Sequence, residues 1–167
     1  DMNDGQLTSV CTSAGCTGGT ALVTGATRTP AMATATLPLG NGYTTTYGYD
    51  YRLRLGSITT AQGGSVRQGV TLTYDLASNV DTVTDAVGAE YVHYVYDSLN
   101  RLLSMEWNGL GGIGNYVYNQ VGNLLSKEEI QGENVSLIYP SAGQSRPHAV
   151  TAVTGSVTRA FAYDNNG

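Results

Sequence analysis

The sequence predicts an all-β protein of stacked antiparallel β-hairpins that form a curved or spiralling sheet. Residue types that favour strands or turns are frequent, with 12 Tyr, many Thr and 22 Gly in 167 residues. Short runs alternate polar with apolar or aromatic residues, and no window keeps an apolar period of 3.6 residues. A Tyr-Asp pair also recurs along the chain, which is typical of a repeat architecture.

The recurring unit is a Tyr followed by Asp or Asn, and successive tyrosines lie 21 to 25 positions apart. Its six copies carry Tyr49, Tyr74, Tyr96, Tyr118, Tyr139 and Tyr163, and in the copy of Tyr139 the next residue is Pro140. An apolar residue follows six positions after the Tyr in four of them, at Leu55, Val80, Leu102 and Leu124. The Tyr and the apolar residue six positions later recur with the same spacing. This indicates one structural unit that is repeated along the chain.

Each unit predicts strand, tight turn, strand. The residues that follow the tyrosines at the start of the turns are Asp50, Asp75, Asp97, Asn119 and Asp164. Asp or Asn at this place can accept a hydrogen bond from the backbone two residues further on. Gly or Asn often stands three residues later, and both tolerate positive φ. A type I turn followed by such a residue closes a hairpin with a β-bulge.

One such hairpin cannot cover its own aromatic face, so neighbouring hairpins must cover it. A buried Tyr removes about 150–250 Å² from water, which corresponds to an upper bound of about 4–6 kcal/mol. Its hydroxyl then needs a partner. We expect this partner to be an Asp of the same or a neighbouring turn.

Two regions are expected along the chain. Residues 43–167 form the regular repeat sheet, and residues 1–42 form a degenerate repeat region with a cysteine pair and a Thr/Ala-rich stretch. Leu7 and Val10 fit the two apolar columns, so a degenerate copy is expected within residues 17–42. The alternative for that stretch is an irregular loop or linker.

Cys11 and Cys16 lie close together in the sequence. A disulfide between them would close a small loop and indicate an oxidising compartment. The alternative is two inert thiols. A metal site is not expected, because the chain has no other Cys and only two His.

Charge and hydropathy argue against two classes of partner. The net charge is −5 and there is no basic patch, so binding to nucleic acid through phosphates is not expected. No apolar run approaches about 18 residues, so no membrane-spanning helix is expected. No signal peptide pattern stands at the start.

Three patterns suggest a chemical site and fail on inspection. The sequence GLGGIG at 109–114 matches a dinucleotide-binding motif, but a strand pattern follows it where a helix is needed. His93 and His148 have no partner at catalytic spacing, so structural or surface roles are expected. The repeated Asp residues suggest the paired acids of glycosidases, but their period fits turns better. No catalytic, cofactor-binding or metal-binding residue is therefore expected, and the protein is not expected to be an enzyme.

Three segments of the sequence resemble repeats of the Rhs/YD-repeat family, whose signature is roughly Tyr-x-Tyr-Asp-x-x-Gly-Arg/Asn-Leu. These segments are YGYDYRLRL, YVYDSLNRL and YVYNQVGNL. The resemblance covers residues 40–167, and residues 1–10 more weakly. Leu53 and Ser78 replace Gly, and Asn119 replaces Asp. The resemblance implies a sheet that spirals into a hollow shell, which in bacterial Rhs and Tc-type toxins encloses a C-terminal toxic domain. Related repeats occur in teneurin-like surface proteins. Both ends of the chain look cut from a longer polypeptide.

We therefore expect a structural, non-enzymatic segment of such a shell, which encapsulates or displays a toxic or effector domain. It would be secreted or at a bacterial cell surface. Its partners would be neighbouring repeats of a parent chain, or further copies that self-assemble through open sheet edges. The alternative is a surface or filament module that binds glycans or partner chains through exposed aromatic residues such as Trp107.

Overall fold

The protein is all-β in the computed structural model, as the sequence predicts. The structure describes residues 2–3, 6–7, 9–12, 19–109, 111–128, 132, 134–141 and 143–164, and every regular element among them is a strand. The strands are β1 (Met2–Asn3), β2 (Gln6–Leu7), β3 (Val10–Cys11), β4 (Ala21–Val23), β5 (Thr27–Arg28), β6 (Thr34–Pro38), β7 (Thr44–Tyr49), β8 (Leu55–Gln62), β9 (Ser65–Tyr74), β10 (Val80–Asp85), β11 (Glu90–Tyr96), β12 (Leu102–Trp107), β13 (Gly112–Tyr118), β14 (Leu124–Glu128), β15 (Asn134–Ile138), β16 (Ala152–Gly155) and β17 (Arg159–Ala160).

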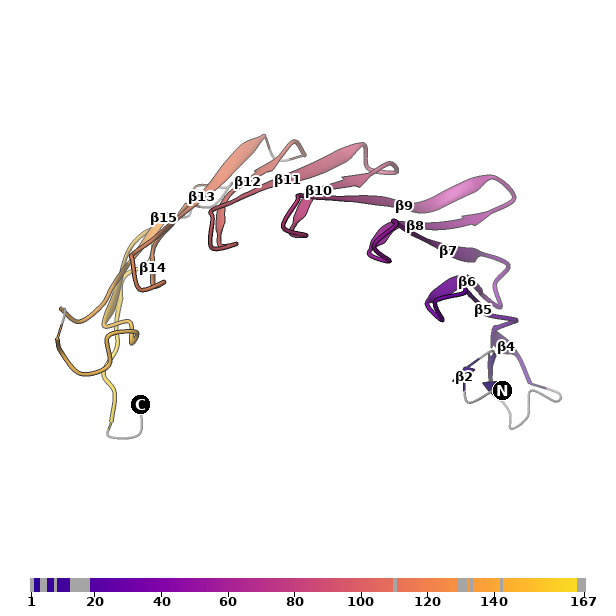
Figure 1. The fold of residues 1–167 in the computed structure, drawn as a ribbon, viewed down its shortest axis with the longest axis horizontal. Coiled ribbons are helices and arrows are strands. Elements are labelled where there is room, and N and C mark those ends of the chain that lie inside the picture. The colour runs from indigo at the N-terminus through magenta and orange to yellow at the C-terminus, as the bar shows by residue number, and fades with distance from the viewer. Residues whose placement is uncertain are drawn as a thin grey trace. The chain divides into compact units, whose positions relative to one another are not determined.

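Strands β5 to β17 form an antiparallel sheet of 13 strands in which the strand order is the order of the chain. Strands β1 and β2, and strands β3 and β4, form two small separate sheets. The chain divides into two compact units. The first contains Asp1–Tyr74 and Thr82–Glu90, and the second contains Asp75–Asp81 and Tyr91–Gly167. Within each unit, consecutive strands are joined by hairpins (Figure 1).

A β-bulge adjoins three of the repeat turns, as expected, and its extra residue lies in the strand that follows the turn, at Gly56, Leu103 and Leu125. The register shifts between Gly48 and Tyr49 in the pair β7–β8. It shifts in the same way between Val95 and Tyr96 in β11–β12. A third shift lies before Tyr118 in β13–β14. The extra residue turns the following apolar side chain back to the face that carries the tyrosines.

One face of each unit carries the half-buried tyrosines. In the second unit, Tyr94 pairs across strands with Met105, and Tyr96 pairs with Leu102. Aromatic and aliphatic side chains in such cross-strand pairs cover each other. The opposite face exposes apolar side chains, for example Val95 at 41%, Ile113 at 57% and Val117 at 50%.

The described residues form no central hydrophobic core. Their buried side chains are those of Thr45, which is 7% exposed, and Asn123, which is 8% exposed, and both are polar. Each apolar side chain instead keeps part of its surface in contact with water. Stability therefore comes from contacts between successive hairpins, as in other repeat proteins.

A hairpin with the turn bonds of the repeat lies within residues 17–42, where a degenerate copy is expected. Strands β5 and β6 form a hairpin in which the Thr29 N–H donates to the Ala33 carbonyl and the Met32 N–H donates to the Thr29 carbonyl. Met32 has a φ of 65°. These are the backbone bonds of the Tyr-Asp turns described below, so this hairpin has the turn geometry expected of a degenerate copy. The division of the chain at residue 42 stays a prediction.

Candidate functional site

The most regular constellation in the molecule is the turn that follows the tyrosine of each repeat. In the Asp50 turn, the Asp50 N–H donates to the Arg54 carbonyl, and the Leu53 N–H donates to the Asp50 carbonyl, both at 2.9 Å. Leu53 has a φ of 62°. The same two backbone bonds occur in the turns that begin at Asp75, Asp97 and Asn119. Their fourth residues also have positive φ, with 74° at Ser78, 60° at Asn100 and 90° at Gly122.

The Asp side chain closes its own turn. In residues 97–101, Asp97 Oδ1 accepts hydrogen bonds from the backbone N–H groups of Leu99 at 2.8 Å and Arg101 at 2.9 Å. Asp97 Oδ2 accepts from Arg101 Nε at 2.7 Å and lies 2.6 Å from Arg101 Nη2. The Arg101 backbone bond and then its guanidinium lower the pKa of Asp97, against partial desolvation.

The arginine of one turn also reaches the tyrosine of the next repeat. Arg54 lies 4.1 Å from the ring centroid of Tyr74, and Arg101 lies 4.7 Å from that of Tyr118. Both distances are within cation–π range. Asp50 and Asp97 hold these guanidinium groups in place from the other side. Each such turn is therefore a clamp of aspartate, arginine and tyrosine that joins two successive repeats.

The hydroxyls of four repeat tyrosines bond to groups other than the turn aspartates, so the expectation of an Asp partner is wrong for these four. Their acceptors are backbone carbonyls of the preceding repeat. Tyr49 donates to Thr34, Tyr74 to Leu55, Tyr139 to Leu124 and Tyr163 to Val150, at 2.7 to 2.9 Å. The physical reason is that the carboxylates already accept the N–H groups of their own turns.

Two turns carry Asn in place of Arg, and their side chains make other contacts. Asn79 Nδ2 donates to Asp75 Oδ2 and to Asn100 Oδ1, both at 2.9 Å. Asn123 Nδ2 donates to the Pro147 carbonyl at 2.8 Å, and Asn123 Oδ1 contacts His148 Nδ1. Asparagine therefore ties its turn to a neighbouring turn or loop rather than to an aromatic ring.

A surface cavity of about 500 Å³ lies beside the Asn119 turn. Its walls include Asn119 and Asn123 from the turn, and Tyr139 and Pro147 from the following loop. The ring of Tyr139 occupies the place in the repeat that Tyr118 has beside Arg101. Here the short Asn123 side chain replaces the long arginine.

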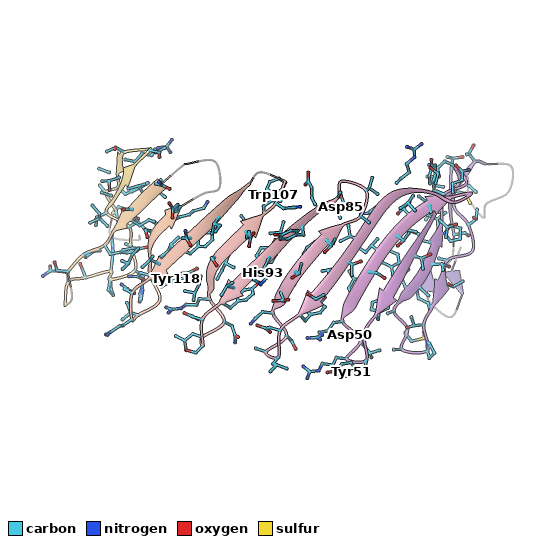
Figure 2. The ribbon with its side chains drawn as sticks, turned by 90° about the horizontal axis from the view of Figure 1, so that it is seen from above. Asp50, Tyr51, Asp85, His93, Trp107 and Tyr118 are labelled. Carbon is cyan, nitrogen blue, oxygen red and sulfur yellow. The ribbon has the colours of Figure 1, made fainter. Side chains whose placement is uncertain are left out.

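The other residues singled out from sequence are scattered. Trp107 is half-buried at the end of β12 and pairs with Val92 and Gly112. Figure 2 shows it near the strand ends opposite to those that carry Tyr118. Asp164 and Tyr163 are exposed. Cys11 lies in β3, but Cys16 lies outside the described residues, so the disulfide stays a prediction.

Sequence reasoning missed three pairings. Arg54 and Arg101 hold the Arg/Asn position of the family signature, and the sequence alone gives them no role. His93 Nε2 lies 3.5 Å from Asp81 Oδ1, an exposed cross-strand pair that only the strand register could have revealed. Arg67 Nε donates to the hydroxyl of Tyr43, 24 residues away, at 3.0 Å.

Neither a metal site nor a membrane-spanning helix is found in the described residues. Within them, no three His, Cys, Asp or Glu side chains come close enough together to hold a metal ion. The same residues contain no helix of the length and apolar character that crossing a bilayer requires.

Comparisons with known proteins lead to bacterial toxins. No family model matches the chain. The chain is 31% identical over 94 residues to the double-stranded DNA deaminase toxin A of Burkholderia cenocepacia, which covers 54% of this chain and 6% of that protein. It is similar in structure to TcdB2-TccC3 without its hypervariable C-terminal region, with a TM-score of 0.69 and 19% identity over 82% of this chain and 8% of that one.

The Tc holotoxin pore of Photorhabdus luminescens is also similar, with a TM-score of 0.63 and 20% identity over 72% of this chain and 8% of that one. The chain thus spans less than a tenth of the length of these proteins. At these identities the structures show a shared fold. The expected resemblance to the Rhs/YD-repeat family is confirmed by the fold that this chain shares with the Tc toxin structures.

Proposed function

We propose that the chain is a structural, non-enzymatic segment of a toxin-associated shell that encloses or displays a toxic or effector domain. The observation that carries this proposal is the clamp that joins successive repeats. Arg101 is held by the Asp97 of its own turn and stacks on Tyr118 of the next repeat. Such contacts extend a sheet by adding repeats and need no central core.

The use of the acidic groups supports a structural role. Asp50 and Asp97 each accept two backbone N–H groups and a guanidinium. Their oxygens are therefore engaged within the turn, whereas a general acid or base must reach a substrate proton. The deaminase activity in the name of the Burkholderia relative belongs to that protein, of which the chain covers 6%.

The relatives support the toxin association and the kind of partner. The chain covers 8% of the Tc toxin chains that share its fold. We therefore propose that its partners are the repeats before and after it in a secreted or cell-surface bacterial toxin. Those repeats would continue the sheet at its first and last strands, β5 and β17.

Limited proteolysis of the natural polypeptide that contains this segment tests the proposal. The downstream effector region is expected to resist protease in the intact protein and to be cleaved after Arg101→Ala combined with Tyr118→Ala. Leu76→Ala is the matched control, because Leu76 is 95% exposed. Equal cleavage of the effector region in all three proteins would contradict enclosure.

Glycan binding through Trp107 is a second candidate. Trp107 lies at the end of β12 and keeps part of its surface exposed to water. A sugar ring stacks well on an aromatic face of this kind. A glycan array should show binding that Trp107→Ala abolishes, while Met105→Leu on the same strand leaves it unchanged. Binding that survives Trp107→Ala would remove this candidate.

A further inference from the structure

A second site lies at the opposite end of the hairpin β8–β9 from the Tyr-Asp turn. In this hairpin Thr60 pairs with Gln68 and Ala61 pairs with Val66, so Arg67 is the extra residue of a β-bulge. Bulges re-aim side chains and occur often next to functional sites. The bulge directs Arg67 to Tyr43, with which it forms a hydrogen bond.

The phenol of Tyr43 orients the guanidinium. Arg67 Nε donates to the Tyr43 hydroxyl at 3.0 Å. Tyr43 is itself held by a tight turn, in which the Leu39 N–H donates to the Tyr43 carbonyl at 2.7 Å and the Tyr43 N–H donates to Asn41 Oδ1 at 3.2 Å. The Nε bond uses one of five N–H groups of the guanidinium and fixes the plane of the others.

Arg67 differs from the arginines of the clamps in its partner. Arg54 and Arg101 are each paired with an aspartate. Among the residues that the structure describes, no carboxylate lies within ion-pair distance of Arg67. The chain has 13 acidic and 8 basic residues, so a guanidinium paired with a phenol rather than an acid is unusual here.

A surface cavity of about 290 Å³ adjoins this guanidinium. It is lined by Leu39, Asn41, Tyr43, Thr60 and Arg67, all of the first unit. Its polar groups are a guanidinium, an amide and two hydroxyls, and its apolar wall is Leu39. The planar guanidinium fork matches the two oxygens of a carboxylate, and charged hydrogen bonds of this kind are the strong ones.

We propose that this cavity binds the carboxylate of an Asp or Glu side chain in a partner peptide segment, with Arg67 as the anchor. Leu39 fits the aliphatic stem of such a side chain. An acidic sugar would place hydroxyl groups against Leu39, where they lose hydrogen bonds to water. The site stands on other residues than the clamps, so its role does not depend on the shell function.

The test is a titration of the full 167-residue chain followed by the NMR signals of the arginine Nε–H groups. The probe is a glutamate blocked at both ends, and the matched control probe is blocked glutamine, which has the same shape and no charge. Glucuronate and inorganic phosphate are tested in parallel. The Arg67 signal should shift saturably with the glutamate probe and bind it at least about tenfold more tightly than the other three probes.

Two variants show whether binding depends on the two-point geometry of the Arg67 guanidinium or on its positive charge alone. Arg67→Lys keeps the charge and should weaken binding by about tenfold, because it loses the bidentate geometry. Arg52→Gln removes an exposed arginine of the same unit and should leave binding unchanged. The proposal is overturned by equal shifts at Arg52 and Arg67, by full binding in Arg67→Lys, or by glucuronate or phosphate that binds at least as tightly as the glutamate probe.

Discussion

The Asp97 turn and the Asn119 turn have the same backbone and different side-chain contacts. Both close with the same pair of backbone hydrogen bonds and a fourth residue of positive φ. In the Asp97 turn, Arg101 is clamped by the carboxylate and stacks on Tyr118. In the Asn119 turn, Asn123 is buried and bonds to the loop at Pro147 and His148.

The two turns show that the repeat performs two separate tasks. The Asp or Asn that begins the turn, together with the residue of positive φ, sets the hairpin. The residue four positions after the Asp or Asn sets how the hairpin is tied to its neighbours. Arginine ties it to the next tyrosine, and asparagine ties it to polar groups of a neighbouring turn or loop. The Arg/Asn choice therefore changes the contact between repeats and leaves the turn intact.

Removal of Tyr118, whose ring lies beside Arg101, should have the largest effect on stability. Tyr118→Ala deletes the ring that pairs with Leu124 and lies beside Arg101. We expect a loss of about 2–4 kcal/mol in the free energy of unfolding, because a large, half-buried aromatic side chain is removed. Urea denaturation measures this loss, with Tyr118→Phe as the control that keeps the ring. A loss below about 1 kcal/mol would show that the ring carries little of the contact.

Removal of the contact between Asn123 and the loop at Pro147 should have the next largest effect on stability. Asn123→Ala leaves the Pro147 carbonyl without its side-chain donor in a site that is 8% exposed. The expected loss is about 1–3 kcal/mol in the free energy of unfolding. Denaturation of Val121→Ala, an exposed change in the same turn, is the matched comparison. Equal stability of the two variants would mean that the turn needs no tie to the loop.

Much of this architecture could be predicted from the sequence. The spacing of the tyrosines, the Asx turns and the bulges all follow from local rules of strand and turn chemistry. The acceptor of the tyrosine hydroxyl was predicted wrongly, because it depends on which oxygens the turn has already used. The pairs Arg67–Tyr43 and His93–Asp81 depend on strand register and on a bulge, and neither repeats with the period.

Backbone strain in the turns offers a smaller test. Gly122 has a φ of 90°, and a Cβ added there would meet no atom within 4 Å. Gly122→Ala should therefore cost about 1–2 kcal/mol through backbone conformation alone. Asn100→Gly at the equivalent place relieves little strain, since Asn already tolerates positive φ, and it removes the Asn100 Oδ1 acceptor of Asn79, so it should cost about 0.5–1.5 kcal/mol. Thermal unfolding of both variants checks this, and a Gly122→Ala variant as stable as the wild type would contradict the strain.

Acidification should affect the two turns differently, with the smallest effect. Hydrogen bonds from Arg101 lower the pKa of Asp97 below its value in the unfolded chain, which is about 3.9. The stability that Asp97 adds is therefore complete above that value and is lost as pH falls through the folded pKa. The Asn119 side chain does not titrate. Asp97→Asn should flatten the fall of Tm below about pH 4, and an unchanged profile there would contradict this use of the carboxylate.

The central claim is that arginine, in the turns that carry it, couples the turn to the tyrosine of the next repeat. A double-mutant cycle of Arg101 and Tyr118 tests this claim most directly. Unfolding free energies of Arg101→Met, Tyr118→Leu and the double variant give the coupling energy. We predict about 0.5–1 kcal/mol for this pair, and less for Asn123→Ala with Tyr139→Leu, where no guanidinium is present. A coupling of zero between Arg101 and Tyr118, or an equal coupling in the asparagine pair, would contradict the account.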